Sequence, residues 1–144
     1  VTMSTRTKAI RQSIRRNSDQ IGRVSKQAGA LRKQRKRASD QIGKQIDRAA
    51  GSARNLRERK RREAASYARQ IERASSTSRK KQLRQARKRN AENYRRQIER
   101  LMDRVKSCRQ TRKRNNESYR RRIESLMEKC RSLRDRNRRL RDSI

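Results

Sequence analysis

The chain has 144 residues, of which 48 are Lys or Arg and 14 are Asp or Glu, so its formal net charge is +34. Hydrophobic residues make up 28% and charged residues 43%, whereas a typical soluble domain is about 45–50% apolar and about 25% charged. With neither Trp nor Phe, this composition excludes an ordinary globular domain with a layered core. It is also typical of chains that are disordered when free, so the sequence leaves open whether the chain orders only on binding.

The absence of His removes the side chain that most often serves as a general base and metal ligand. The acidic residues are scattered and form no converging pair of carboxylates. We therefore expect a non-enzymatic protein with no catalytic residue, no metal site, no cofactor and no small-molecule substrate. No stretch approaches the roughly 20 apolar residues of a membrane span, so we also expect no transmembrane segment.

The first region, residues 1–51, is basic and contains every glycine of the chain: Gly22, Gly29, Gly43 and Gly51. Glycine inside a helix costs about 1 kcal/mol relative to alanine, so we expect this region to be helical with looser or broken segments. Its start, Val1-Thr2-Met3, indicates an amino terminus that has been trimmed or processed.

The second region, residues 52–144, contains neither glycine nor proline. Arg, Lys, Gln, Glu, Leu, Met and Ala dominate it, and all of them favour helices. We therefore expect one continuous basic helix from residue 52 to residue 144.

An internal repeat organises this region. Arg87-Lys88-Arg89-Asn90 returns 25 residues later as Arg112-Lys113-Arg114-Asn115, and the match continues through Tyr94 and Tyr119. A weaker copy around Tyr67 precedes Tyr94 by 27 residues, and fainter copies lie further upstream. Because 25 residues are close to seven helical turns, successive copies present the same face. The predicted fold is all-α: an extended, non-globular long helix or coiled-coil-like rod of about five degenerate repeats of ~25 residues.

Apolar residues within the repeats form a thin seam with alternating spacings of four and three, as in a coiled coil. The seam comprises Tyr94, Ile98, Leu101, Val105, Cys108, Tyr119, Ile123, Leu126, Cys130, Leu133 and Leu140. Arg flanks it on both sides, as at Arg120 and Arg122, and acids lie on the outer face. A second copy would place Arg against Arg, which disfavours a self-dimer. We expect the seam to contact something acidic: a partner helix, a protein lattice or a phosphate backbone.

The two cysteines, Cys108 and Cys130, occupy seam positions. Their separation of 22 residues corresponds to about 33 Å on one helix, so they cannot bridge each other within it. We interpret them as small packing residues. Two unpaired thiols favour an intracellular reducing compartment, such as a nucleus or nucleoid, the interior of a virion, or the cytoskeleton.

Arg outnumbers Lys by 36 to 12, which favours contacts with phosphate because the guanidinium group binds it through two hydrogen bonds. The candidate polyanion-binding residues are the basic runs of the repeats: Arg35, Lys36, Arg37, Lys60, Arg61, Arg62, Arg87, Lys88, Arg89, Arg95, Arg96, Arg112, Lys113, Arg114, Arg120, Arg121, Arg122, Arg138 and Arg139.

Two partners fit these residues, and both make the chain part of a larger assembly. The leading hypothesis is a nucleic-acid-binding protein that packages or condenses DNA or RNA, as a chromatin or virion component, without reading sequence. The alternative is a structural protein whose repeats line an acidic protein scaffold, such as a microtubule wall, another cytoskeletal filament or the inside of a viral capsid. Total charge favours nucleic acid, whereas a repeat that keeps its phase favours a lattice.

Overall fold

The computed structural model describes residues 4–144, which form two helices, α1 (Thr5–Arg73) and α2 (Thr77–Asp142). No strand occurs in that range, so the prediction of an all-α chain is confirmed for it. The interpretation of Val1-Thr2-Met3 as a processed terminus lies outside the described residues.

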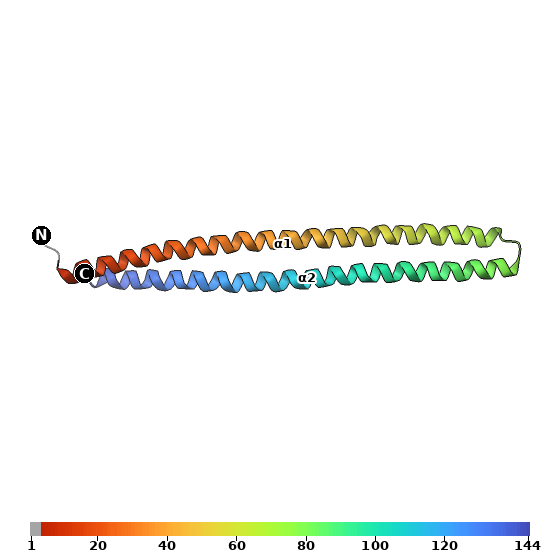
Figure 1. Cartoon of the computed structure of the whole chain (residues 1–144). Coiled ribbons are helices and arrows are strands. Elements are labelled where there is room, and N and C mark those ends of the chain that lie inside the picture. Colours follow the sequence, from red (N-terminus) through yellow and green to blue (C-terminus); the bar gives the residue numbers. More distant parts are fainter. Residues whose placement is uncertain (1–3) are drawn as a thin grey trace. The chain divides into compact units, whose positions relative to one another are not determined.

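The chain divides into two compact units, and each contains a segment of both helices. Unit 1 combines the chain up to Ser39 with Lys113–Ile144, and unit 2 is Asp40–Arg112. In Figure 1, unit 1 comprises the red and orange part of α1 with the blue part of α2, and unit 2 comprises the yellow and green segments. Within each unit the two segments run antiparallel: as the residue numbers along α1 increase, the residue numbers of their hydrogen-bond partners on α2 decrease.

The expected unbroken helix from residue 52 to residue 144 is wrong, because the chain reverses at Ala74–Ser76. Serine makes this turn without glycine or proline. The Ser76 hydroxyl accepts a hydrogen bond from the Arg79 amide at 3.0 Å and so caps the first turn of α2. Ser4 caps α1 in the same way, through the Thr7 amide at 3.2 Å.

The glycine-containing region is also more regular than expected. Residues 5–51 lie within the unbroken α1 and contain no break. None of the glycines adopts a positive φ angle, so none marks a turn. Gly43 is the one that lies close to a side chain: a Cβ there would be 3.4 Å from the Arg112 Nη1 atom. The cost of glycine in a helix is small enough that packing against α2 offsets it.

Unit 2 is held together by a small apolar core. Ile46 and Ala49 of α1 pack with Val105 of α2, and Leu101 and Cys108 lie against them. Val105 is 1% exposed. The core is narrow because each helix contributes one apolar stripe, and small residues such as Ala49 let the helices approach closely.

Unit 1 adds polar contacts to its apolar stripe of Val24, Ala28, Leu31, Ile123, Cys130 and Leu133. Asn137 is 3% exposed, and its side-chain oxygen accepts a hydrogen bond from the Asn17 amide at 2.9 Å. Its own amide donates to the Ile14 carbonyl at 3.4 Å and the Ser18 hydroxyl at 3.3 Å. A fully paired buried Asn favours one alignment of two helices, because sliding them would leave it unpaired.

Truncating the centre of the unit 2 core tests how much the narrow stripe contributes. Val105→Ala should lower the free energy of unfolding by about 1–3 kcal/mol, because it removes buried methyl groups and leaves a cavity. Urea denaturation followed by circular dichroism measures this change. The control is Lys106→Ala, an exposed neighbour on the same helix, which should change stability by less than about 0.5 kcal/mol. Equal effects of the two substitutions would contradict the assignment of Val105 to a core.

Candidate polyanion-binding surface

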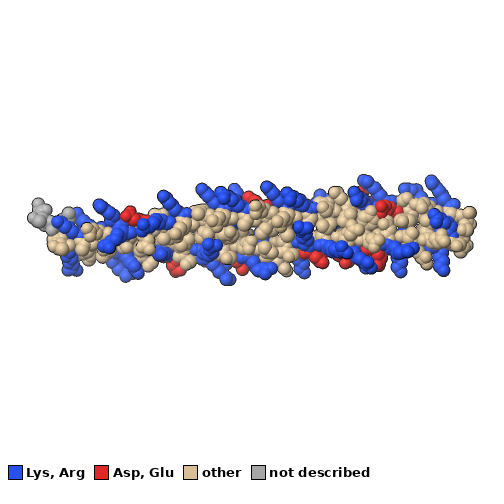
Figure 2. Space-filling model, in the orientation of Figure 1, with Lys and Arg blue, Asp and Glu red and all other residues tan. Residues whose placement is uncertain are grey.

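The basic side chains lie almost entirely on the surface. Of the 48 Lys and Arg residues, 44 are exposed and none is buried. The four half-buried ones are Arg35, Lys60, Lys80 and Arg112. Figure 2 shows these cations along both helices on the visible face, with few acidic patches between them. The arrangement keeps charged groups in water, where they avoid the cost of burial.

Sixteen of the nineteen predicted polyanion-binding residues are exposed. The other three, Arg35, Lys60 and Arg112, are half-buried. The Arg35 Nε atom donates to the Asn116 side-chain oxygen at 3.4 Å, which ties its guanidinium to α2. The predicted residues are divided between the two units and do not converge on a single site. They form an extended surface on each unit.

Few of these cations are neutralised by the chain itself. Seven ion pairs occur among residues 4–144, and each joins residues three or four apart on one helix. They engage six of the 48 basic side chains, all six of them Arg. One of the seven joins Glu92 and Arg96 at 3.6 Å, one helical turn apart on α2.

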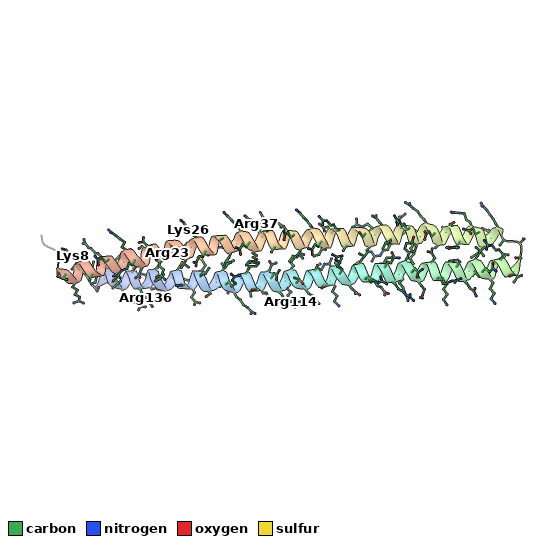
Figure 3. The ribbon with its side chains drawn as sticks, viewed as in Figure 1. Lys8, Arg23, Lys26, Arg37, Arg114 and Arg136 are labelled. Atoms are coloured by element: carbon green, nitrogen blue, oxygen red, sulfur yellow. The ribbon has the colours of Figure 1, made fainter. Side chains whose placement is uncertain are left out.

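The net charge is shared almost equally between the units. Each contains 24 basic residues, against six acidic residues in unit 1 and eight in unit 2, so the charges are +18 and +16. Figure 3 shows Lys26 and Arg37 on the outer side of α1, and Arg114 on the outer side of α2. Cations therefore stand on the outer faces as well as beside the contact between the helices.

The seam predicted on α2 is in contact with α1 of the same chain. Val105, Ile123, Cys130 and Leu133 are buried. The other seam residues are half-buried: Tyr94, Ile98, Leu101, Cys108, Tyr119, Leu126 and Leu140. The expectation that the seam meets an acidic partner is therefore wrong, because a basic helix occupies it within each unit.

Neutral polar residues on α1 explain how two basic helices can pack. Gln20, Gln27, Gln34 and Gln41 recur at every seventh residue, which keeps them on one side of the helix. On the other side of the stripe, Ser18 and Ser25 have the same spacing. Gln27 lines a hollow with Arg121 and Arg122 of α2, and Ser18 lines another with Arg134 and Arg141, so no Arg of α1 meets them there. This seven-residue spacing is visible in the sequence, but it lies outside the apolar pattern that predicts a seam.

Of three hollows between the helices, two show this pairing of neutral residues on α1 with Arg on α2, whereas the third contains one Arg from each helix. The Arg122 hollow has a volume of about 630 Å³ and is lined by Gln27, Ala30, Leu31, Arg121, Arg122, Ser125 and Leu126. The Arg141 hollow, of about 220 Å³, is lined by Ser18, Ile21, Arg134, Asn137 and Arg141. The Arg104 hollow, of about 170 Å³, is lined by Gln45, Arg48, Ala49, Ser52, Leu101 and Arg104. Each contains two Arg residues and no carboxylate, so each favours an anion.

An acidic residue does enter the contact between the helices at one place in unit 2. The Glu63 carboxylate accepts a hydrogen bond from the Asn90 amide at 2.9 Å. Hydrogen bonds from Asn90 and Tyr94, with the nearby positive charge of Arg59, lower the pKa of Glu63 below its ordinary value of 4.5. The hydrogen bond to Glu63 raises the pKa of the Tyr94 hydroxyl above 10.0, because it favours the protonated phenol.

The cysteines and the remaining tyrosines take structural positions. The Cys130 thiol is buried and lies 3.8 Å from both the Ile21 carbonyl and the Ser25 hydroxyl. The Cys108 thiol lies 3.7 Å from the Gln45 side-chain oxygen. Both thiols are unpaired. Tyr119 is half-buried with the Arg122 guanidinium 5.8 Å from its ring centre, and Tyr67 is half-buried too.

The chain matches no protein-family model, no curated protein and no solved structure. Across residues 4–144, neither helix contains a segment of the length and hydropathy needed to span a bilayer. The chemistry of the surface is therefore the basis for any assignment of function.

The contact between Glu63 and Asn90 should make stability depend on pH. Because the pKa of Glu63 is lower in the folded chain than in the unfolded chain, its contribution is present above about pH 4.5 and disappears as the pH falls through the folded pKa. Glu63→Gln should lower the melting temperature at pH 7, and the difference between the two proteins should shrink as the pH falls through the folded pKa of Glu63. Thermal unfolding followed by circular dichroism measures this difference. Glu72→Gln, an exposed carboxyl on the same helix, is the control and should show no such convergence.

Proposed function

We propose that the chain binds nucleic acid through its phosphates, without reading base sequence, and acts as a packaging or condensing protein. The observation that supports this proposal is the number of unneutralised cations: 42 of the 48 basic side chains take part in no ion pair within residues 4–144. Nucleic acid supplies phosphates at regular short spacing, and binding releases the counterions that such a surface holds.

The arrangement favours phosphate contacts over base recognition. A helix that reads bases places a few selected side chains in the major groove, whereas this surface carries cations along every part of both helices. Three quarters of these cations are Arg, whose guanidinium group binds phosphate through two hydrogen bonds. Affinity should therefore depend on salt and hardly at all on sequence.

We further propose that the helices of each unit pair as an antiparallel coiled coil built from the ~25-residue repeats. The alternating four- and three-residue spacing of the buried positions supports this, as does the burial of equivalent residues in successive repeats, such as Val105 and Cys130. A paired scaffold holds the cations in place before binding. Less side-chain and backbone entropy is then lost when a polyanion binds.

The same pairing weakens the case for a protein lattice. The repeat keeps its phase along α2, which the sequence alone could attribute to a periodic external partner. Packing within the chain is enough to account for the repeat, because the repeat returns seam residues to the face that α1 covers. The excess positive charge plays no part in that packing. An acidic filament or capsid wall therefore remains the second candidate, without an observation of its own.

Binding to duplex DNA should be tight and strongly dependent on salt. Fluorescence anisotropy with a labelled 24-base-pair duplex, titrated from 50 to 300 mM salt, should give a log–log slope of about −5 or steeper, because several phosphates are neutralised. An AT-rich and a GC-rich duplex should bind within about threefold of each other. Failure to bind at 150 mM salt would overturn the proposal.

The lattice candidate is tested in parallel with a polymerised acidic filament. Co-sedimentation with assembled filaments at 150 mM salt should show weaker binding than DNA at the same charge concentration. Saturable binding to filaments at a fixed ratio of chain to subunit, with DNA unable to compete, would favour the lattice instead.

A further inference from the structure

The Arg141 hollow in unit 1 combines a charged rim with a fixed polar wall. Arg134 and Arg141 are seven residues apart on α2, or about 10.5 Å along the helix axis, so they stand two turns apart on one side. Ser18 of α1 lies opposite them, and Asn137 and Ile21 complete the lining. No carboxylate lines this hollow, and neither Arg takes part in an ion pair within residues 4–144.

A buried network fixes the wall of this hollow. The Asn137 amide donates to the Ser18 hydroxyl oxygen at 3.3 Å and to the Ile14 carbonyl at 3.4 Å. The Asn137 oxygen is occupied by the Asn17 amide at 2.9 Å. Ser18 therefore receives a hydrogen bond at its oxygen and keeps its own proton to donate. Asn137 is 3% exposed, so these bonds are shielded from competing water.

The groups that remain available in the hollow are two guanidinium groups, which can only donate, and one hydroxyl, which keeps a proton to donate. A site with two positive charges and these donors favours a small anion with several acceptor oxygens. The volume of about 220 Å³ equals that of about seven water molecules at ~30 Å³ each, which accommodates a partly hydrated phosphate group. The Arg122 hollow has a largely apolar floor, and no comparable network holds the Arg104 hollow.

We propose that the Arg141 hollow binds a phosphate group, held by the guanidinium groups of Arg134 and Arg141 from two sides and by the Ser18 hydroxyl from the opposite helix. A free phosphate and a phosphodiester present the same oxygens to these donors. The site does not depend on the proposed function, because it can be measured with inorganic phosphate alone.

Arginine side-chain NMR on the full ¹⁵N-labelled chain tests the site. Titration with inorganic phosphate in low-salt buffer at pH 7 should shift the Nε–Hε signals of Arg134 and Arg141 along a saturable curve. Arg134→Gln with Arg141→Gln should raise the Kd for phosphate at least tenfold. Ser18→Ala should raise it severalfold while both Arg residues remain.

The matched control is Arg16→Gln with Arg23→Gln. These two residues are also seven apart and exposed in unit 1, and they do not line the hollow, so the net charge falls by the same amount. This variant should keep the Kd within about twofold of the unchanged protein. Circular dichroism establishes that both variants keep their helices. Equal weakening by the two variants, or signals that shift without saturation, would overturn the site.

A second arm identifies the source of the phosphate. The same two variants are titrated against a short DNA duplex. A larger loss for the Arg134 and Arg141 variant supports a site that takes backbone phosphates, and equal losses, together with selective binding of inorganic phosphate, support a site for free phosphate. A chain that binds phosphate here and fails to bind DNA would contradict the proposed function and leave the site intact.

Discussion

Repulsion between two strongly basic helices is the constraint on which the rest of the structure depends. A like-charged pair at 4 Å costs about 1 kcal/mol even in water, and the units carry +18 and +16. Packing is possible because α1 places Ser and Gln, such as Ser18 and Gln27, beside the Arg flanks of α2. The cations of both helices then point into solvent, where counterions screen them. The two helices are therefore not interchangeable, although both are rich in Arg.

Polar contacts within the seam supply the alignment that a thin apolar stripe cannot. An Ala- and Leu-lined stripe tolerates sliding by a turn, because one small apolar residue replaces another at little cost. The bond between Asn17 and Asn137 in unit 1 and the bond between Glu63 and Asn90 in unit 2 do not tolerate it. A shift would leave those groups without partners, and the buried Asn137 amide alone would then cost about 1–3 kcal/mol. Apolar burial thus supplies attraction, and buried amides determine the alignment.

The sequence predicted the helical class and the seam of α2, because alternating spacing and helix propensity are local properties. It did not predict the reversal at Ala74–Ser76, since residues 52–144 contain neither glycine nor proline and the chain turns at a serine cap, Ser76, instead. One signal was available: Tyr67 and Tyr94 are 27 residues apart whereas Tyr94 and Tyr119 are 25 apart, and the turn lies between Tyr67 and Tyr94. The sequence also did not predict that α1 covers the seam of α2, because Gln and Ser at seven-residue spacing do not form an apolar pattern.

Separating the packing surface from the charged surface has a consequence for binding. Forty-four exposed cations on helices that pack through other residues can all contact an anion without disturbing the fold. A disordered chain of equal charge would lose about 1–2 kcal/mol of backbone entropy for each residue that becomes ordered on binding. Here packing and hydrogen bonds within each unit have already ordered the backbone, so this entropy is lost on folding and not on binding. Under the proposed function, the seam, which contributes no charge, therefore reduces the entropy lost when a regular polyanion binds.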